Sequence, residues 1–200
     1  MPSIKSKPFY ISEWIEELKK RWGPIREEVC ELKAESRFLF EASWEVCNKV
    51  GGIYTVVKSK AALMKEKYEN YFLVGPYIKE KAEVEFEEQE VPHFLQETFH
   101  QLEKEGFKCH FGKWLIKGEP NTILVEPGNL GEKKDGIKTG LWEKHKVDSM
   151  RAGWDFEEPM IWATAAGRLI EVATGKIKEI EKENKISVQC HEWMAAFIIL

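Results

Sequence analysis

The stretch that decides the fold runs from Arg37 to Lys67 and reads RFLFEASWEVCNKVGGIYTVVKSKAALMKEK. Its first eight residues, Arg37–Trp44, form an apolar and aromatic run that is short enough for a strand and too continuous for a half-exposed one. A turn containing Gly51 and Gly52 follows, and apolar residues then recur at helical spacing at Ile53, Val56, Val57, Ala61 and Met64. Strand, glycine-rich turn and helix form the first half of a βαβ unit, in which ligands bind beyond the carboxyl ends of the strands.

The chemistry of this turn favours an anion. Two successive glycines, Gly51 and Gly52, allow positive φ and leave no Cβ in the way of a close approach. The helix that follows directs unpaired N–H groups and the positive end of its dipole at the turn, and Lys49 adds a full positive charge. We therefore expect a phosphate or a carboxylate here. The alternative is that the glycines serve the turn geometry alone, since neither Gly-x-Gly-x-x-Gly nor the P-loop pattern is present.

The segment FEASWEVCNKVGGIYTV, residues 40–56, resembles the N-terminal signature of glycogen synthases of the animal and fungal type, which bacterial and archaeal relatives share. The resemblance continues in the family's order at YFLVGPY (residues 71–77), FGKWLI (residues 111–116) and HEW (residues 191–193). It covers most of the chain from Arg37 onward. The resemblance implies an α/β fold: the Rossmann-like N-terminal domain of a two-domain (GT-B type) glycosyltransferase of family 3.

The same resemblance implies an activity and a set of site residues. Such enzymes are cytoplasmic, retaining glucosyltransferases that transfer glucose from UDP-glucose to the non-reducing end of an α-1,4-glucan such as glycogen, without a metal or another cofactor. By resemblance, Lys49 contacts the donor phosphate, and Gly51 and Gly52 allow close backbone approach to the donor. His191 matches the histidine that contacts the transferred glucose, which makes it the candidate catalytic residue. Without the resemblance, a lone histidine at a strand-to-helix junction is more often structural than functional.

Two other classes of function remain open on the residues. One is a non-catalytic module that binds a nucleotide or a glucan, and the other is an interaction subunit that works through its N-terminal helices. The chain stops within the apolar run AAFIIL, residues 195–200, so we expect it to be a truncated domain of a longer enzyme whose C-terminal domain is absent. Reading the chain beyond Leu200 would separate the three classes.

Composition narrows the class of protein. The formal charge of −4 over 200 residues argues against a nucleic-acid partner, and no run reaches the length of a membrane span. The four cysteines lack the paired spacing of a zinc site, so we expect buried free thiols in a reducing cytoplasm. The N-terminus carries no secretory signal. Expected partners are therefore UDP-glucose and a glucan, with a possible homo-oligomer in the full-length enzyme.

The remaining pattern divides the chain into an N-terminal helical extension, residues 1–36, and a Rossmann-like domain, residues 37–200. Within the second part we expect strands at 71–74 and 186–189, a strand pair between 107 and 125, and a helix from Phe94 that Gly106 ends. Residues 79–90 read as an edge strand or loop, and residues 127–140 as a long mobile loop. Pro159 is expected to open a helix that Gly175 ends, and another helix follows Met194.

Two pairs of polar residues have weaker support as site residues. His93 and His100 lie a helical repeat apart but lack a third ligand, so they read as surface residues rather than metal ligands. Glu157 and Glu158 could bind sugar hydroxyls, although acidic residues also favour the first turn of a helix for electrostatic reasons alone.

Overall fold

The computed structural model describes residues 37–180 and 184–200 of the chain. These residues belong to one compact unit, Ala34–Leu200. The helical extension expected over residues 1–36 lies outside the described residues, so it stays a prediction.

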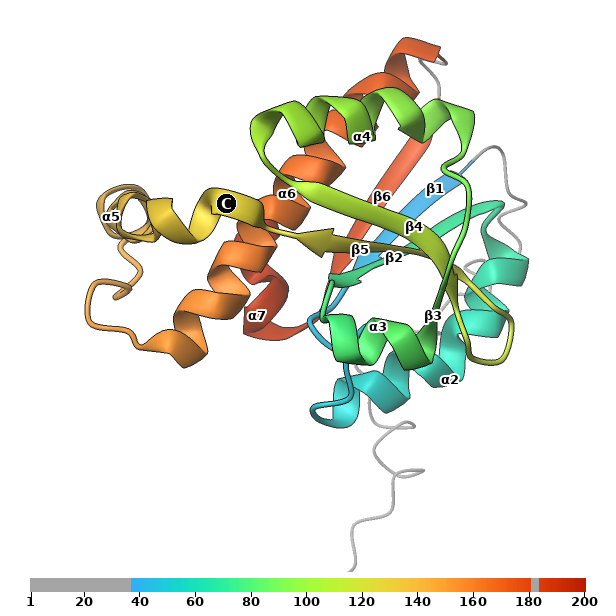
Figure 1. Cartoon of the computed structure of the whole chain (residues 1–200), viewed down its shortest axis with the longest axis horizontal. Coiled ribbons are helices and arrows are strands. Elements are labelled where there is room, and N and C mark those ends of the chain that lie inside the picture. Colours follow the sequence, from blue (N-terminus) through green and yellow to red (C-terminus); the bar gives the residue numbers. More distant parts are fainter. Residues whose placement is uncertain (1–36, 181–183) are drawn as a thin grey trace, which may run out of the picture. The chain divides into compact units, whose positions relative to one another are not determined.

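In the described part of the chain, six strands form one mixed sheet in the order β3-β4-β5-β2-β1-β6 (Figure 1). β5, β2, β1 and β6 pair in parallel, whereas β4 runs antiparallel between β3 and β5. The strands are β1 (Arg37–Ala42), β2 (Asn70–Pro76), β3 (Phe86–Glu88), β4 (Lys108–Trp114), β5 (Asn121–Glu126) and β6 (Lys185–Cys190). A largely parallel sheet with alternating helices confirms the predicted α/β, Rossmann-like class.

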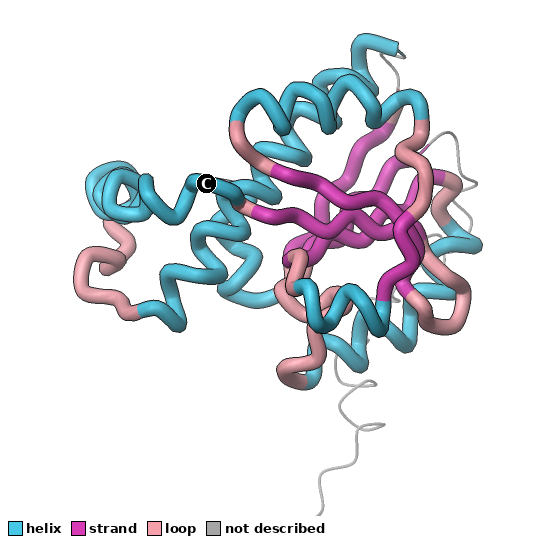
Figure 2. Tube along the Cα trace, viewed as in Figure 1, coloured by secondary structure: helices cyan, strands magenta, loops and turns pink. Residues whose placement is uncertain are grey.

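Helices cover both faces of this sheet (Figure 2). α4 and α6 lie over one face and α2 and α3 over the other (Figure 1). The helices are α2 (Gly52–Lys67), α3 (Lys79–Glu85), α4 (His93–Glu105), α5 (Lys134–His145), α6 (Trp154–Ile180) and α7 (Glu192–Ala196), with 3-10 turns η2 (Gly128–Lys133) and η3 (Phe197–Ile199). Within the described part of the chain, no helix combines the length and the apolar character that a membrane crossing requires.

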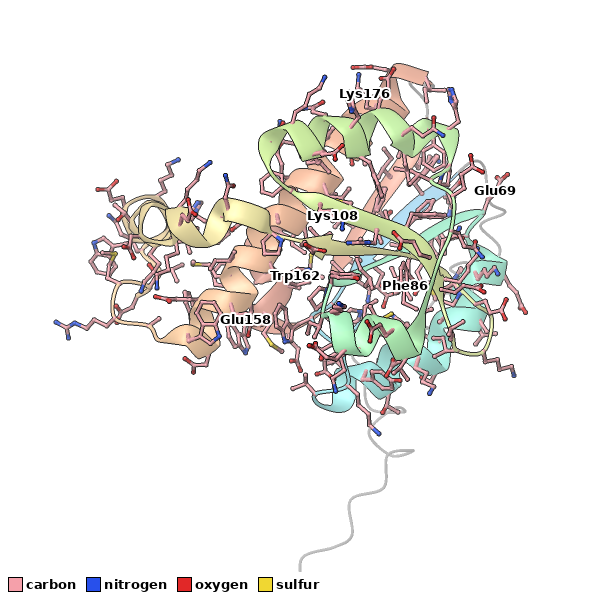
Figure 3. The ribbon with its side chains drawn as sticks, viewed as in Figure 1. Glu69, Phe86, Lys108, Glu158, Trp162 and Lys176 are labelled. Carbon is pink, nitrogen blue, oxygen red and sulfur yellow. The ribbon has the colours of Figure 1, made fainter. Side chains whose placement is uncertain are left out.

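The central strand β1 is buried on both faces, as its continuous apolar run predicts. Phe40 and Ala42 join the core beneath α4 and α6, while Leu39 joins the core beneath α2. Just after β1, Trp44 packs edge-on against Trp162 of α6, with ring centroids 5.5 Å apart. Figure 3 labels Trp162 at this position between α6 and the sheet.

Several local predictions are confirmed. β4 and β5 form the expected strand pair, which is antiparallel, and β2 and β6 contain the two other predicted strands. α4 ends at Gly106, whose φ of 91° is the left-handed conformation that glycine adopts at little cost. The described cysteines, Cys47, Cys109 and Cys190, are free as predicted, but only Cys47 is fully buried, whereas Cys109 and Cys190 are half-buried. Burial raises the pKa of Cys109 to about 12.

Residues 79–90 differ from the expectation of a strand or loop alone. Lys79–Glu85 form the helix α3, and only Phe86–Glu88 form a strand, β3, at the edge of the sheet. The segment is rich in Lys and Glu, which favour helices when a contact can anchor them. Glu85 provides that anchor, because its Oε2 accepts hydrogen bonds from Tyr54 Oη and Trp114 Nε1, each at 2.9 Å.

The prediction of a mobile loop at residues 127–140 is wrong. This segment forms η2 and most of α5. Gly136 and Gly140 argue against a helix from sequence alone, since each glycine costs about 1 kcal/mol relative to alanine. The tertiary structure overrides that preference by burying Leu130 and Leu141 in the core beneath α6.

The predicted bounds of the long helix are also wrong at both ends. α6 begins at Trp154, five residues before Pro159, and continues past Gly175 to Ile180. Pro159 lies near the N-terminal end of the helix, where the loss of one N–H is tolerated. Ile177 is 1% exposed, so its burial holds the last turn in place beyond Gly175.

On α2, the inward face differs slightly from the predicted stripe. Tyr54, Val57 and Ala61 are buried, whereas Val56, which the spacing assigned to the inner face, is 47% exposed. Tyr54 takes the inner position and packs against Trp114 with ring centroids 5.3 Å apart.

Candidate functional site

The predicted site residues lie at one edge of the sheet, where parallel strands end. The last residue of β1, Ala42, pairs with the last residue of β6, Cys190. The loop after β1 carries Lys49, Gly51 and Gly52, and His191 directly follows β6. The structure therefore brings the two predicted halves of the site to adjacent strand ends, although they are far apart in the sequence.

Both loops are fixed to the sheet by backbone hydrogen bonds. Ser43 N–H donates to the carbonyl of Val74 at 3.0 Å, and His191 N–H donates to the carbonyl of Ala42 at 3.0 Å. Each loop also contains a non-glycine residue with positive φ, Cys47 at 52° and Glu192 at 61°. Such conformations cost about 1–3 kcal/mol each and gather at functional sites.

The N-terminus of α2 already holds an anionic group, the carboxylate of Glu45. Glu45 Oε2 accepts hydrogen bonds from the N–H groups of Gly51 at 2.7 Å and Tyr54 at 2.9 Å, and the residue is 3% exposed. Among the described residues, no partner is found for the N–H groups of Gly52 and Ile53. The N-terminus of α2 thus attracts negative charge, as the helix dipole predicts. The Glu45 carboxylate takes up two of the four N–H groups named here and leaves those of Gly52 and Ile53.

The conformational argument for the two glycines is not supported. Gly51 has φ −144°, and among the described residues the glycines with positive φ are Gly106, Gly118 and Gly128. The argument from space holds at Gly51, where an added Cβ would lie 3.0 Å from Glu45 Oε1. Gly52 has open space around the position of a Cβ. Lys49, Gly51 and Gly52 are all exposed, so the edge is open to a ligand.

His191 contacts a buried carboxylate that the sequence analysis did not single out. Its Nε2 lies 2.6 Å from Oε1 of Glu41, a residue of β1 that is fully buried. The same oxygen lies 2.8 Å from Nζ of Lys60 on α2, and Tyr71 Oη of β2 donates to Oε2 at 2.7 Å. Burial alone raises the pKa of Glu41, but the hydrogen bonds from His191, Lys60 and Tyr71 outweigh it, so this pKa lies below its usual value.

Glu41 and Glu45 are site residues that sequence reasoning missed. A signal for Glu41 was present: a charged side chain inside the buried run FLFEA needs a partner, because an uncompensated buried charge is very costly. For Glu45, the signal was its position six residues before a helix-opening glycine, which does not by itself distinguish a cap from a surface residue.

A second polar cluster lies near the same edge of the sheet, where the parallel strands end, but on the side of β4 rather than of β6. The ring of His110, on β4, stacks on Tyr77 with centroids 3.9 Å apart. Its Nδ1 is 3.0 Å from Glu88 and its Nε2 is 3.0 Å from Glu126. Nearby, Lys108 opens β4 (Figure 3). Since both ring nitrogens face carboxylates, this histidine is fully engaged within the protein.

The weaker candidates have structural explanations. Glu157 is buried and accepts from Lys134 at 2.8 Å and Lys138 at 2.7 Å, so its carboxylate is already paired. Glu158 is exposed near the start of α6 (Figure 3). His93 and His100 are exposed, and no group of three potential metal ligands is found in residues 37–180 and 184–200.

Comparison with known proteins gives the family. A family model described as glycogen synthase matches residues 41–200, four-fifths of the chain, including both loops of the candidate site. The chain belongs to the glycogen synthase family. The predicted resemblance is therefore confirmed, and Lys49, Gly51, Gly52 and His191 all lie within the matched region.

Curated members of the glycogen synthase family are similar to this chain over a limited part of their length. The liver glycogen [starch] synthase of Homo sapiens is 34% identical over 170 residues, which are 84% of this chain and 24% of the relative. The glycogen [starch] synthase of Caenorhabditis elegans is 38% identical over 129 residues, 60% of this chain and 19% of the relative. The glycogen [starch] synthase of Dictyostelium discoideum is 33% identical over 163 residues, which are 79% of this chain and 17% of the relative. The chain thus spans about a quarter or less of these relatives.

Proposed function

We propose that this chain is part of the N-terminal half of a retaining glucosyltransferase that transfers glucose from UDP-glucose to the non-reducing end of an α-1,4-glucan. The observation that supports the proposal is that the loop carrying Lys49 follows β1 and His191 follows the neighbouring strand β6, both within the region that matches the glycogen synthase family. We infer the two-domain GT-B architecture from the family. In that architecture the edge described here forms one wall of the donor cleft.

In this proposal the two loops have different tasks. The Lys49 ammonium and the N–H groups of Gly52 and Ile53 offer positive charge to the diphosphate, whose terminal phosphate gains a further negative charge when the glycosidic C–O bond breaks. Glu45 fixes the backbone at the N-terminus of α2, because its carboxylate accepts hydrogen bonds from the N–H groups of Gly51 and Tyr54. His191 contacts the sugar that is transferred. Catalysis then rests on fixed charges and donors that stabilise the leaving group and the developing oxocarbenium ion.

The proposal includes no metal or other cofactor, a cytoplasmic location, and assembly into homo-oligomers by the complete enzyme. The positive charge for the leaving diphosphate comes from Lys49 and from the N-terminus of α2, so a divalent cation is not required for that task. A reducing cytoplasm agrees with the free state of Cys47, Cys109 and Cys190.

The decisive experiment measures glucosyl transfer by the longest gene product that carries this chain. Purified protein is incubated with UDP-[14C]glucose and glycogen, with and without EDTA, and label in the precipitated glucan is counted. We expect incorporation in both conditions. Incorporation from ADP-[14C]glucose in place of UDP-[14C]glucose would overturn the donor assignment. Binding of donor or glucan without any incorporation would favour a non-catalytic module.

A further inference from the structure

Glu41 joins His191 to the interior of the domain. The two residues are 150 positions apart in the sequence, and they meet because β1 and β6 are neighbours in the sheet. The backbone of His191 is held at Ala42, and its ring is held at Glu41 Oε1 at 2.6 Å. A side chain with both attachments has little freedom to turn away from this position.

Glu41 itself is fixed from two further directions. Tyr71 Oη donates to one carboxylate oxygen at 2.7 Å, and Lys60 Nζ lies 2.8 Å from the other. Glu41 is fully buried, whereas Lys60 and His191 are partly exposed, with 27% and 12% of their side chains accessible. The network therefore leads from a rigid buried anchor to a histidine at the open edge.

The charge state of Glu41 decides which nitrogen of His191 carries a proton. The hydrogen bonds of this network hold the pKa of Glu41 below its usual value despite burial, so the carboxylate is ionised near neutral pH and can only accept hydrogen bonds. The nitrogen in contact with it, Nε2, must then donate. In a neutral imidazole this leaves Nδ1 with a lone pair, because the partner of one ring nitrogen selects the tautomer.

We propose that Glu41 is a positioning residue that holds His191 in the Nε2–H tautomer and leaves Nδ1 as the acceptor for a hydroxyl of the transferred sugar. The contact of Nδ1 with the sugar rests on the proposed function. The tautomer of His191 does not depend on that function. A purely structural reading is that Glu41 only neutralises Lys60. The two readings differ in what happens at His191 when Glu41 is changed.

The first test reads the tautomer directly in this chain, independently of any glucosyl transfer. Histidine labelled with 15N reports, through long-range 1H–15N correlations, which ring nitrogen carries the proton, and His191→Asn assigns the signal. We expect a single Nε2–H form in the parent chain and a mixture of tautomers in Glu41→Gln. An unchanged Nε2–H form in Glu41→Gln would overturn the proposal.

A matched control separates positioning from loss of a buried ion pair. Glu157 is also a buried glutamate held by two cations, Lys134 and Lys138, but it belongs to the contact between α5 and α6. Glu157→Gln should lower the stability of the chain and leave the His191 signals unchanged. If Glu41→Gln does not fold, as judged by circular dichroism, Glu41→Asp takes its place, since the shorter side chain withdraws the carboxylate from Nε2 while keeping the charge.

The second test is a double-mutant cycle on glucosyl transfer in the longest gene product that carries the chain. Glu41→Gln should lower kcat by about 10- to 100-fold, the range expected when the charge-assisted hydrogen bond that orients His191 is lost. In the His191→Ala background the same change should alter kcat less than about twofold, because the residue through which Glu41 acts is gone. Equal losses in both backgrounds would overturn the proposal. If no variant transfers glucose, the proposed function fails, and the tautomer measurement still decides the role of Glu41.

Discussion

At the scale of single residues, the open edge of the sheet combines exposed and buried charges that have separate roles. Lys49 is exposed and without a structural task in the described contacts, whereas Glu41 and Glu45 are buried acceptors that hold neighbouring groups in place. Substitution of the exposed Lys49 should therefore affect ligand binding alone. Substitution of the buried Glu41 or Glu45 should lower the stability of the protein as well.

We predict that Lys49→Ala lowers kcat/KM for UDP-glucose by roughly 10- to 150-fold, because a charge-assisted hydrogen bond is worth about 1.5–3 kcal/mol. The melting temperature should not change, since the side chain is exposed. Steady-state kinetics of the longest gene product measures the first quantity and calorimetry the second.

Lys67→Ala is the matched control for that variant. Lys67 is an exposed lysine in the last turn of α2, the helix that follows Lys49. The rise of an α-helix places it about 20 Å from the N-terminus of α2. Its removal should leave the kinetics unchanged. Equal effects of the two variants would mean that general surface charge, not a donor contact, attracts the nucleotide sugar.

His191→Ala should lower kcat more than it raises KM, because a contact to the transferred sugar that tightens as the glycosidic bond breaks appears in turnover. Initial rates over a range of UDP-glucose concentrations separate the two constants. A raised KM with unchanged kcat would make His191 a residue for ground-state binding and would contradict its assigned role.

At the scale of elements, the N-terminus of α2 offers a test in two adjacent glycines. Gly51→Ala should destabilise the chain by about 0.5–2 kcal/mol, the usual cost of a lost helix cap, because the new methyl group would press on the Glu45 carboxylate. Gly52→Ala should be neutral or stabilising by up to about 1 kcal/mol, since it is helical and has open space. Urea denaturation of both variants checks this prediction. The opposite ranking would show that Glu45 yields easily and that the cap contributes little.

The packing of α4 against α6 predicts a pH dependence. Arg168 of α6 contacts both carboxylate oxygens of Glu105, at 2.7 and 2.8 Å, and these hydrogen bonds, with one from Gln101, lower the pKa of Glu105 from 4.5 to about 2. Because the folded-state pKa lies below the unfolded one, the stabilisation is present above pH 4.5 and is lost as the pH falls toward 2.

Since about a third of each side chain is exposed, we expect solvent to reduce this contribution to about 1 kcal/mol. Urea denaturation of the parent chain and Glu105→Gln, at neutral pH and again near pH 3, measures it. The parent should be the more stable at neutral pH, and the difference should shrink at the lower pH. A difference that does not depend on pH would assign the loss to packing rather than to the ion pair.

At the scale of the whole molecule, this 200-residue chain should fold but not transfer glucose. The described part has a six-stranded sheet with a core on each face, which is sufficient for an independent domain. The proposed architecture places the donor between two domains, and the chain spans 24% of the human relative. One wall neither excludes water nor supplies all the fixed charges of the site.

The assay is incubation of the purified chain with UDP-[14C]glucose and glycogen beside the longer gene product, after contaminating host synthase is excluded. Circular dichroism and a cooperative melt show whether the chain is folded. Label incorporated at even about a hundredth of the rate of the longer protein, a factor worth only about 2.7 kcal/mol of activation free energy, would place the active site within these residues.

Much of the architecture could be predicted because it is encoded in local patterns. The apolar run of β1 indicated a strand buried on both faces, and the positions of Gly106 and of the strand pair β4–β5 followed from turn chemistry. The signature at residues 40–56 indicated the family. The strand-and-turn pattern placed Lys49 in the loop after β1 and His191 directly after β6. The helix α5 was missed because Gly136 and Gly140 disfavour a helix locally, while buried contacts in the folded chain outweigh that preference. The helix α3 was missed because its charged sequence lacks an apolar stripe, although Lys and Glu favour helices and Glu85 anchors it to Tyr54 and Trp114.

The contacts between side chains within the site were decided by the tertiary structure. The sequence by itself determined that a glycine-rich turn would follow β1 and that a histidine would follow β6. It did not determine that Glu45 would occupy the N-terminus of α2 or that Glu41 would hold the ring of His191. The physical reason is the order of the strands. β1 and β6 are the first and last strands of the sheet along the chain, and no local period specifies that they pair side by side, so a contact across 150 residues exists only once the whole sheet has formed.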